Sequence, residues 1–137
     1  MPLENLDHYF IYAPDLEKSC KFYSRILGLE DGARPNFEFD GHWFYLNKKP
    51  VVHIGTNGFP GGMPSSEEKK KSIPASGTGR LDHVAFKATN IQEFITRFEN
   101  ESIYYHKQSI PEFDLTQLFV KDPDGATIEL NFFAADD

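Results

Sequence analysis

The chain has 137 residues, a net charge of −7 and one cysteine. This length fits one domain with a core that needs no disulfides, and the 13 Phe and 6 Tyr residues exclude a disordered chain. The acidic balance contains no long run of like charges, which argues against nucleic acid or an anionic membrane as a partner. Neither a secretory leader nor an apolar stretch of membrane-spanning length is evident. We therefore expect a reduced, soluble, cytoplasmic protein.

The tripeptide Leu-Asp-His occurs twice, each time at the start of a strand-like run. It lies in "LDHYF" at residues 6–10 and, 75 positions later, in "LDHVAF" at residues 81–86. A helix follows the first copy, with Asp15 as its predicted N-cap and Gly28 as its end. The helical spacing predicts that one face of this helix contains Leu16, Cys20, Tyr23 and Leu27.

A second helix follows the second copy. Asn90 is the predicted N-cap, and Glu93 stands three residues later, as in a capping box. The predicted buried face of this helix is formed by Ile91, Phe94, Ile95 and Phe98. The sequence therefore predicts a strand followed by a helix, twice.

Further strands follow each helix. In the first half, residues 36–46 predict two strands joined by a hairpin turn at Asp40-Gly41, and residues 51–55 predict another. In the second half, a tight turn is predicted at residues 122–125, and strands are predicted at 102–108, 114–120 and 126–133. Each half then has the order β-α-β-β-β. The predicted class is α+β.

The single predicted domain, 1–137, contains a module at about 4–56, a connection at 57–80 and a second module at about 81–133. The connection is rich in Gly, Pro and Ser. Connections of this length inside compact domains are usually functional. We expect this segment to be mobile without ligand and to cover the binding site when ligand is present.

Four polar side chains occupy matching places in the two halves. Because strand side chains alternate between faces, those that point away from the helices include His8, His53, His83 and Glu129. The same alternation places Asp7 and Asp82 opposite their histidines, so we interpret both as structural. Taken singly, each of the four is an ordinary surface or core residue. Together on one concave face they would be costly to bury without a partner, and a bound cation removes that cost.

The pattern resembles the vicinal oxygen chelate superfamily, also called the glyoxalase/bleomycin-resistance/dioxygenase superfamily. The resemblance rests on residues 6–29, 50–55, 81–90 and 122–132. It implies two βαβββ modules whose eight strands form an open, cupped sheet around a divalent metal. It also implies that the ligands lie on the first and last strands of each module, at the four positions just named.

Two branches of the superfamily fit this set differently. Glyoxalase I-like members usually have Glu or Gln where His53 stands. Ring-cleaving dioxygenase-like members use two histidines and one glutamate, which His8, His83 and Glu129 match. His53 is then the candidate catalytic acid or base, or a fourth ligand. Fosfomycin-resistance enzymes also use His, His and Glu, but the strands here offer few basic residues for a phosphonate.

The resemblance favours an extradiol-type dioxygenase that uses iron(II) on a small catecholic or enolic substrate. The alternatives are a glyoxalase- or epimerase-like lyase or isomerase, acting through an enediolate with nickel, cobalt, zinc or manganese, and a metal-free resistance protein that only binds. Chelation of two neighbouring substrate oxygens is common to the enzyme options. His106 and Gln117 are candidates to line the substrate pocket. We also expect a homodimer, because an open sheet leaves edges that need covering.

Overall fold

The computed structural model describes residues 2–36, 40–56 and 77–136. The chain divides into two compact units, Met1–Ile73 and Pro74–Asp137. These units contain the two predicted modules. The connection at 57–80, which we expect to cover the binding site, lies almost entirely outside the described residues, so its role stays a prediction. No helix in the described ranges is both long enough and apolar enough to cross a membrane.

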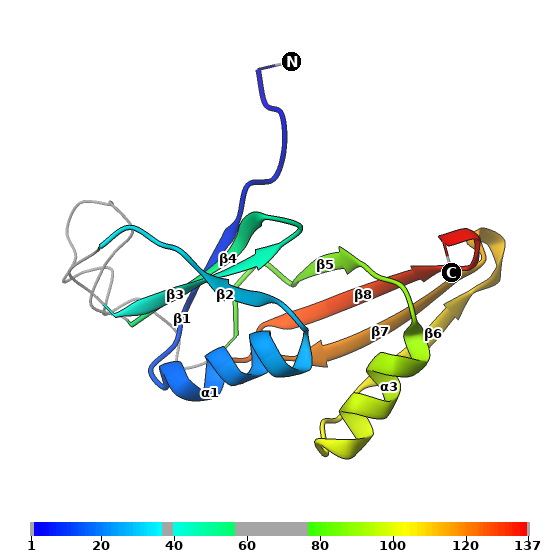
Figure 1. The fold of residues 1–137 in the computed structure, drawn as a ribbon. Helices are drawn as coiled ribbons and strands as arrows, with labels where there is room; N and C mark the ends of the chain where they lie inside the picture. Colours follow the sequence, from blue (N-terminus) through cyan, green and yellow to red (C-terminus); the bar gives the residue numbers. More distant parts are fainter. Residues whose placement is uncertain (1, 37–39, 57–76, 137) are drawn as a thin grey trace. The chain divides into compact units, whose positions relative to one another are not determined.

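The first unit is a four-stranded mixed sheet with one helical segment (Figure 1). Its strand order is β1-β4-β3-β2, with β1 and β4 parallel and the other neighbours antiparallel. Its elements are β1 (Tyr9–Tyr12), α1 (Leu16–Lys21), a π-helical turn (Phe22–Ile26), β2 (Glu30–Gly32), β3 (Gly41–Leu46) and β4 (Lys49–Gly55).

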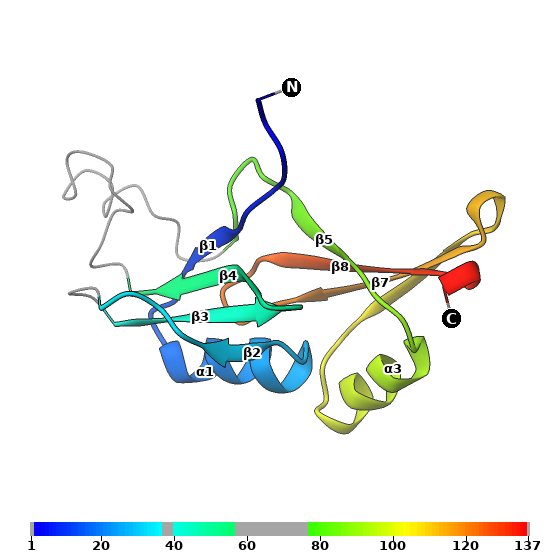
Figure 2. The ribbon, with the colours of Figure 1, turned by 45° about the horizontal axis from the view of Figure 1, so that its top comes forward.

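The second unit repeats this plan. Its strand order is β5-β8-β7-β6, and the parallel pair is again the first and last strand (Figure 2). Its main elements are β5 (His83–Lys87), α3 (Ile91–Asn100), β6 (His106–Ile110), β7 (Leu115–Lys121) and β8 (Thr127–Phe133). Short 3-10 turns lie at Pro111–Phe113 and Ala134–Asp136. The α+β class and the two βαβββ modules are confirmed.

The first helix begins and ends where the sequence predicts. Asp15 Oδ1 accepts a hydrogen bond of 3.1 Å from the backbone N–H of Lys18, and Gly28 follows the helix with a φ of 81°. The predicted buried face is only partly right. The side chains that are buried are Ser19, Phe22, Tyr23 and Ile26. These residues keep the i, i+3, i+4, i+7 spacing of a helix and share Tyr23 with the predicted face, so the buried face is rotated from the predicted one.

The second helix buries Ile95 and Phe98, as predicted. The predicted capping box is wrong. Asn90 has a left-handed φ of 62° and gives the helix no side-chain cap, while Glu93 forms an ion pair of 3.1 Å with Arg97 instead. Phe94 packs α3 onto the second sheet, with its ring 5.7 Å from that of Phe132.

The hairpin turn predicted at Asp40-Gly41 is also wrong. The strand predicted before it falls largely on residues 37–39, which lie outside the described ranges. Among the described strands, β3 pairs with β2 and β4. Gly41 lacks the positive φ that such a hairpin turn requires and instead begins β3. A Cβ atom on Gly41 would lie 2.3 Å from the Ile54 carbonyl oxygen, so glycine permits the close approach of β3 to β4.

Each sheet keeps apolar side chains on its helix-facing side. In the first unit these include Phe44, Val52 and Ile54, and the Phe44 ring lies 6.0 Å from that of Tyr23 after α1. In the second unit the buried residues include Leu118, Val120, Ile128, Leu130 and Phe132. The opposite face of each sheet is left to polar residues, as the alternation predicts.

We predict that Asp122→Ala destabilises the second unit. Asp122 is 4% exposed, and its Oδ1 accepts bonds from the N–H groups of Asp124 and Ala126 at 2.9 and 2.8 Å in the turn between β7 and β8. Leaving these groups unpaired should cost about 1–3 kcal/mol in denaturant unfolding. Asp122→Asn is the matched control, since one amide oxygen can accept both bonds. Equal losses in the two variants would contradict this explanation.

Candidate functional site

The strand register of the second sheet arranges its polar face as transverse rows of side chains. Directly paired residues lie on the same side of the sheet. One row is His83, Thr127 and Lys121; the next is Ala85, Glu129, Phe119 and His106; the third is Lys87, Asn131, Gln117 and Gln108. Two candidate metal ligands and both candidate pocket residues therefore share one face.

Amide side chains fix the orientation of the Glu129 carboxylate. Its Oε2 accepts hydrogen bonds from Asn131 Nδ2 at 2.8 Å and Gln117 Nε2 at 3.2 Å. Gln117 is itself held by Asn131 Oδ1 at 3.0 Å and by Gln108 Nε2, which donates to its Oε1 at 2.9 Å. The Glu129 side chain is only 12% exposed. Its other oxygen, Oε1, remains directed at His83.

His83 faces Glu129 with one ring nitrogen and Asp82 with the other. Its Nε2 lies 3.3 Å from Glu129 Oε1, and its Nδ1 lies 2.8 Å from Asp82 Oδ2. A carboxylate only accepts, so we assign a proton to Nδ1. The hydrogen bond to Asp82, aided by the charge of Glu129, raises the pKa of His83.

His8 has the same carboxylate partner in the first unit. Its Nδ1 lies 2.6 Å from Asp7 Oδ2, and this hydrogen bond lowers the pKa of Asp7. Both Leu-Asp-His copies thus hold the histidine by Nδ1 and leave Nε2 as the nitrogen that can act as a ligand. Histidines that bind metals usually donate their other N–H to a carboxylate in this way.

The prediction that Asp7 and Asp82 lie opposite their histidines is wrong. β1 begins at Tyr9 and β5 begins at His83, so both aspartates precede their strands. The two-residue alternation of a strand does not apply there. The aspartates orient the histidines instead of packing on the other face.

His53 lies in a stack of three rings. Its ring centroid is 3.7 Å from that of His8 and 3.9 Å from that of Trp43, with interplanar angles of 13° and 10°. It is 7% exposed, and its Nε2–H donates to the Pro50 carbonyl at 3.1 Å. Burial, with a smaller effect of His8, lowers the pKa of His53 to about 4. His53 is therefore neutral at pH 7, with Nδ1 as its remaining acceptor.

Sequence reasoning missed Trp43, Asn131 and Gln108 as residues that shape this site. Trp43 pairs with His53 only because the register between β3 and β4 shifts at Phe44/Tyr45. With regular pairing counted back from the turn between β3 and β4, Trp43 would lie opposite Val52. Asn131 carried a usable signal, since it follows Glu129 by two residues on the same face.

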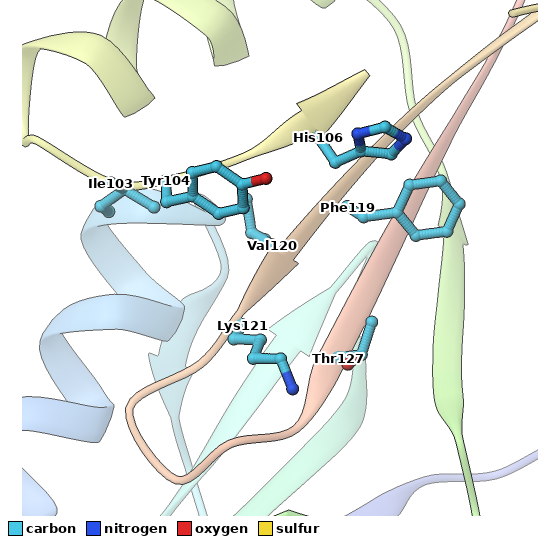
Figure 3. A pocket seen from close by; sticks show the side chains of 7 residues that line it. All are labelled: Ile103, Tyr104, His106, Phe119, Val120, Lys121 and Thr127. Carbon is cyan, nitrogen blue, oxygen red and sulfur yellow. The ribbon is translucent and has the colours of Figure 1, made fainter. Parts of the chain in front are cut away.

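A hollow of about 420 Å³ opens on the second unit (Figure 3), and its lining includes Thr127 and Phe119, the strand partners of His83 and Glu129. It is lined by Ile103, Tyr104, His106, Phe119, Val120, Lys121 and Thr127. His106 lines this hollow, whereas Gln117 lies one row away and supports Glu129. Their contact with a substrate stays a prediction.

The spacing of His83 Nε2 and Glu129 Oε1 in the second unit fits two ligands of one metal ion. Two ligands at ~2.1 Å from an ion, separated by an angle near a right angle or a tetrahedral one, lie roughly 3.0–3.4 Å apart. The His83–Glu129 separation of 3.3 Å is within this range. Within the described residues, no group of three or more His, Cys, Asp or Glu side chains is placed to hold an ion. The ligand set that includes His8 stays a prediction.

We predict that His53 makes the stability of the metal-free protein depend on pH. The pKa of His53 is about 4 in the folded chain and has the ordinary value of 6.5 in the unfolded chain. As the pH falls, the unfolded chain therefore binds the proton before the folded chain does. The stabilising contribution of His53 is therefore complete above pH 6.5 and is lost as the pH falls towards 4. Denaturant unfolding at pH 7 and pH 5 should show a loss on the order of 1 kcal/mol that His53→Gln lacks. The same loss in His53→Gln would show that another group is responsible.

Comparisons with known proteins agree with the fold. A protein named "Glyoxylase I 4" from Arabidopsis thaliana is 26% identical over 131 residues, which cover 93% of this chain and 70% of that protein. The crystal structure of lactoylglutathione lyase from Agrobacterium tumefaciens has a TM-score of 0.67 at 21% identity and covers 96% of this chain and 95% of its own. A putative glyoxalase family protein from Bacillus anthracis has a TM-score of 0.70 at 23% identity, with 96% of each chain covered.

The family model described as "Glyoxalase/Bleomycin resistance protein/Dioxygenase superfamily" matches residues 5–130. This match takes in both units and all four candidate ligand positions. The two structural likenesses concern the fold alone, because their sequence identities are low. The chain belongs to the glyoxalase/bleomycin resistance protein/dioxygenase superfamily.

Proposed function

We propose that the protein is a divalent-metal-dependent enzyme and, among the reactions of its family, an extradiol-type dioxygenase. The observation that carries this proposal is the paired geometry of His83 and Glu129. Their donor atoms lie 3.3 Å apart, Asp82 holds the far side of the imidazole, and two amides hold the far side of the carboxylate. Such support is what metal ligands need and what an ordinary surface pair lacks.

In this proposal His8, His83 and Glu129 would hold iron(II). An iron(II) ion with two histidines and one carboxylate supplies a Lewis acid with open positions for substrate and dioxygen. Asp7 and Asp82 keep the two imidazoles in the tautomer whose Nε2 has a lone pair. Gln117 and Asn131 hold Glu129 Oε2 and leave Oε1 turned towards His83.

The low pKa of His53 favours the dioxygenase over the lyase. Its pKa of about 4 makes it a weak base. A weak base suffices to accept a proton from an acidic hydroxyl group of a catechol, whereas removing a proton from carbon demands a stronger one. Its stacked ring and its bond to Pro50 also oppose a shared role with His8 as ligand, because the two parallel rings do not converge. We therefore assign His53 as the candidate proton acceptor, through Nδ1.

A glyoxalase-like lyase or isomerase is the second candidate, and one observation favours it. The Arabidopsis relative with "Glyoxylase I" in its name matches 93% of this chain. A metal-free binding protein fits less well, because such a protein has no use for the supported His83–Glu129 pair. The homodimer and the cytoplasmic location stay predictions from the sequence.

Oxygen uptake with metal analysis tests the proposal. Metal-free protein is loaded anaerobically with iron(II), nickel, cobalt, zinc or manganese and mixed with catechols or with an enediol-forming hemithioacetal. We expect dioxygen consumption and ring cleavage with iron(II) and a catechol. Turnover of the hemithioacetal with nickel, cobalt or zinc and no oxygen uptake would establish the lyase instead. Failure to bind any of these metals would favour the binding protein.

We predict that His8→Ala and His83→Ala each reduce iron(II) affinity by at least about 100-fold, since each removes a ligand. The double variant should lose little more, because ligands of one site act as a unit. Glu129→Gln should also weaken binding, since it removes the anionic ligand. Calorimetry or competition with a chelator measures the iron(II) affinity of all four variants.

His42→Ala is the matched control for these variants. His42 Nδ1 also has a carboxylate partner, Asp31 Oδ2 at 2.8 Å, but its side chain lies on the helix-facing side of β3 with Phe44. This variant should bind iron(II) as the parent does. Parent-like affinity in both His8→Ala and His83→Ala would refute the shared site and reduce the repeated Leu-Asp-His to a packing feature.

A further inference from the structure

We infer that the hollow on the second unit binds the aromatic ring of a substrate that also carries a carboxylate, with Lys121 as the partner of that carboxylate. This inference rests on the proposed function, because it places the substrate beside His83 and Glu129. It adds the chemical class of that substrate: a planar aromatic acid.

The hollow combines aromatic walls with one cation. Figure 3 shows the rings of Tyr104, His106 and Phe119 towards one end and the side chains of Lys121 and Thr127 towards the other. The volume of about 420 Å³ lies within the roughly 300–1,000 Å³ that small-molecule sites occupy. All the lining residues belong to one unit, so the site does not depend on where the other unit lies.

The aromatic side chains that line the hollow form a surface against which another ring can pack. His106 and Phe119 are paired residues on β6 and β7, and their ring centroids are 6.1 Å apart at an interplanar angle of 38°. Tyr104 is 85% exposed, an unusual amount for a large side chain that lines a hollow. Aromatic rings prefer offset-stacked or edge-to-face neighbours, so these walls favour a flat ring over a saturated one.

The charge of Lys121 favours an anionic group on that ring. Lys121 forms no ion pair with the residues that the structure describes, whereas Lys87, on the same sheet face, pairs with Asp136 at 3.0 Å. The chain as a whole carries a net charge of −7, so a lysine without an ion pair among the described residues is notable. The compact ammonium group of lysine suits a carboxylate as a point charge.

The strand register relates this hollow to the candidate ligands. Lys121 pairs with Thr127, and Thr127 pairs with His83, while Phe119 pairs directly with Glu129. Two strand spacings of about 4.8 Å separate the backbones of Lys121 and His83 by roughly 10 Å. A ring that lies over Phe119, with its carboxylate at Lys121, therefore has one side edge next to Glu129, on the side of the sheet where β5 carries His83. A catechol with a ring carboxylate can place its vicinal oxygens on that edge.

Three simple probes test the ligand class without requiring turnover: benzoate, its neutral analogue benzamide, and its saturated analogue cyclohexanecarboxylate. Their affinities are measured by calorimetry, with chemical-shift changes of the lining residues to locate each probe. We expect benzoate to bind the hollow at least about tenfold more tightly than either analogue, since one lacks the charge and the other lacks the aromatic ring.

Lys121→Gln should remove the preference for benzoate over benzamide and leave metal binding intact. Lys107→Gln is the matched control, because it removes the same charge from β6 on the opposite face, where Lys107 pairs with the buried Leu118. It should keep the preference. Phe119→Leu should reduce the preference for benzoate over cyclohexanecarboxylate, and circular dichroism checks that each variant folds.

The inference is overturned if benzoate and benzamide bind the parent alike, if neither binds at millimolar concentration, or if Lys121→Gln behaves as Lys107→Gln does. Metal titration of the same samples separates this result from the proposed function. Charge-dependent benzoate binding in a protein that takes up no metal would refute the enzyme and retain the aromatic-acid site. Tight metal binding without benzoate selectivity would refute the aromatic-acid site and retain the proposed enzyme.

Discussion

The parallel pairing of the first and last strand in each unit is the constraint on which the candidate site depends. In the second unit, the β5–β8 pair places His83 beside Thr127 and brings its Nε2 to 3.3 Å from Glu129 Oε1. In the first unit, the β1–β4 pair brings the ring of His8 to 3.7 Å from that of His53. Each pairing joins segments far apart in the sequence, because a parallel connection needs a crossover, here supplied by the helix and the inner strands. The polar faces follow from this arrangement, since the helices occupy the other faces.

The same geometry supports different chemistry in the two units. In the second unit it pairs an imidazole with an oriented carboxylate, which is a charged arrangement that suits a cation. In the first unit it pairs two imidazoles, and burial between His8 and Trp43 keeps His53 neutral. This asymmetry is why the proposed function gives His53 a role in proton transfer and gives Glu129 a role in metal binding.

Sequence patterns predicted those features that depend on local periodicity. The two-residue period placed Glu129 and Asn131 opposite Ile128 and Leu130, and the structure agrees. The repeated Leu-Asp-His predicted two equivalent units. Patterns failed in two places. The buried face of the first helix is rotated from the predicted one, and both aspartates act just before their strands begin, where the alternation of a strand does not apply. The register shift at Phe44/Tyr45, which sets Trp43 against His53, depends on contacts that no local pattern contains.

The central claim is that the two Leu-Asp-His copies serve one metal ion. The most direct measurement is the number of iron(II) equivalents bound per chain after anaerobic loading and removal of excess metal. The account predicts one equivalent per chain, because it assigns His8, His83 and Glu129 to the same ion. Two equivalents, one for each unit, would contradict the shared site, and so would the absence of tightly bound iron.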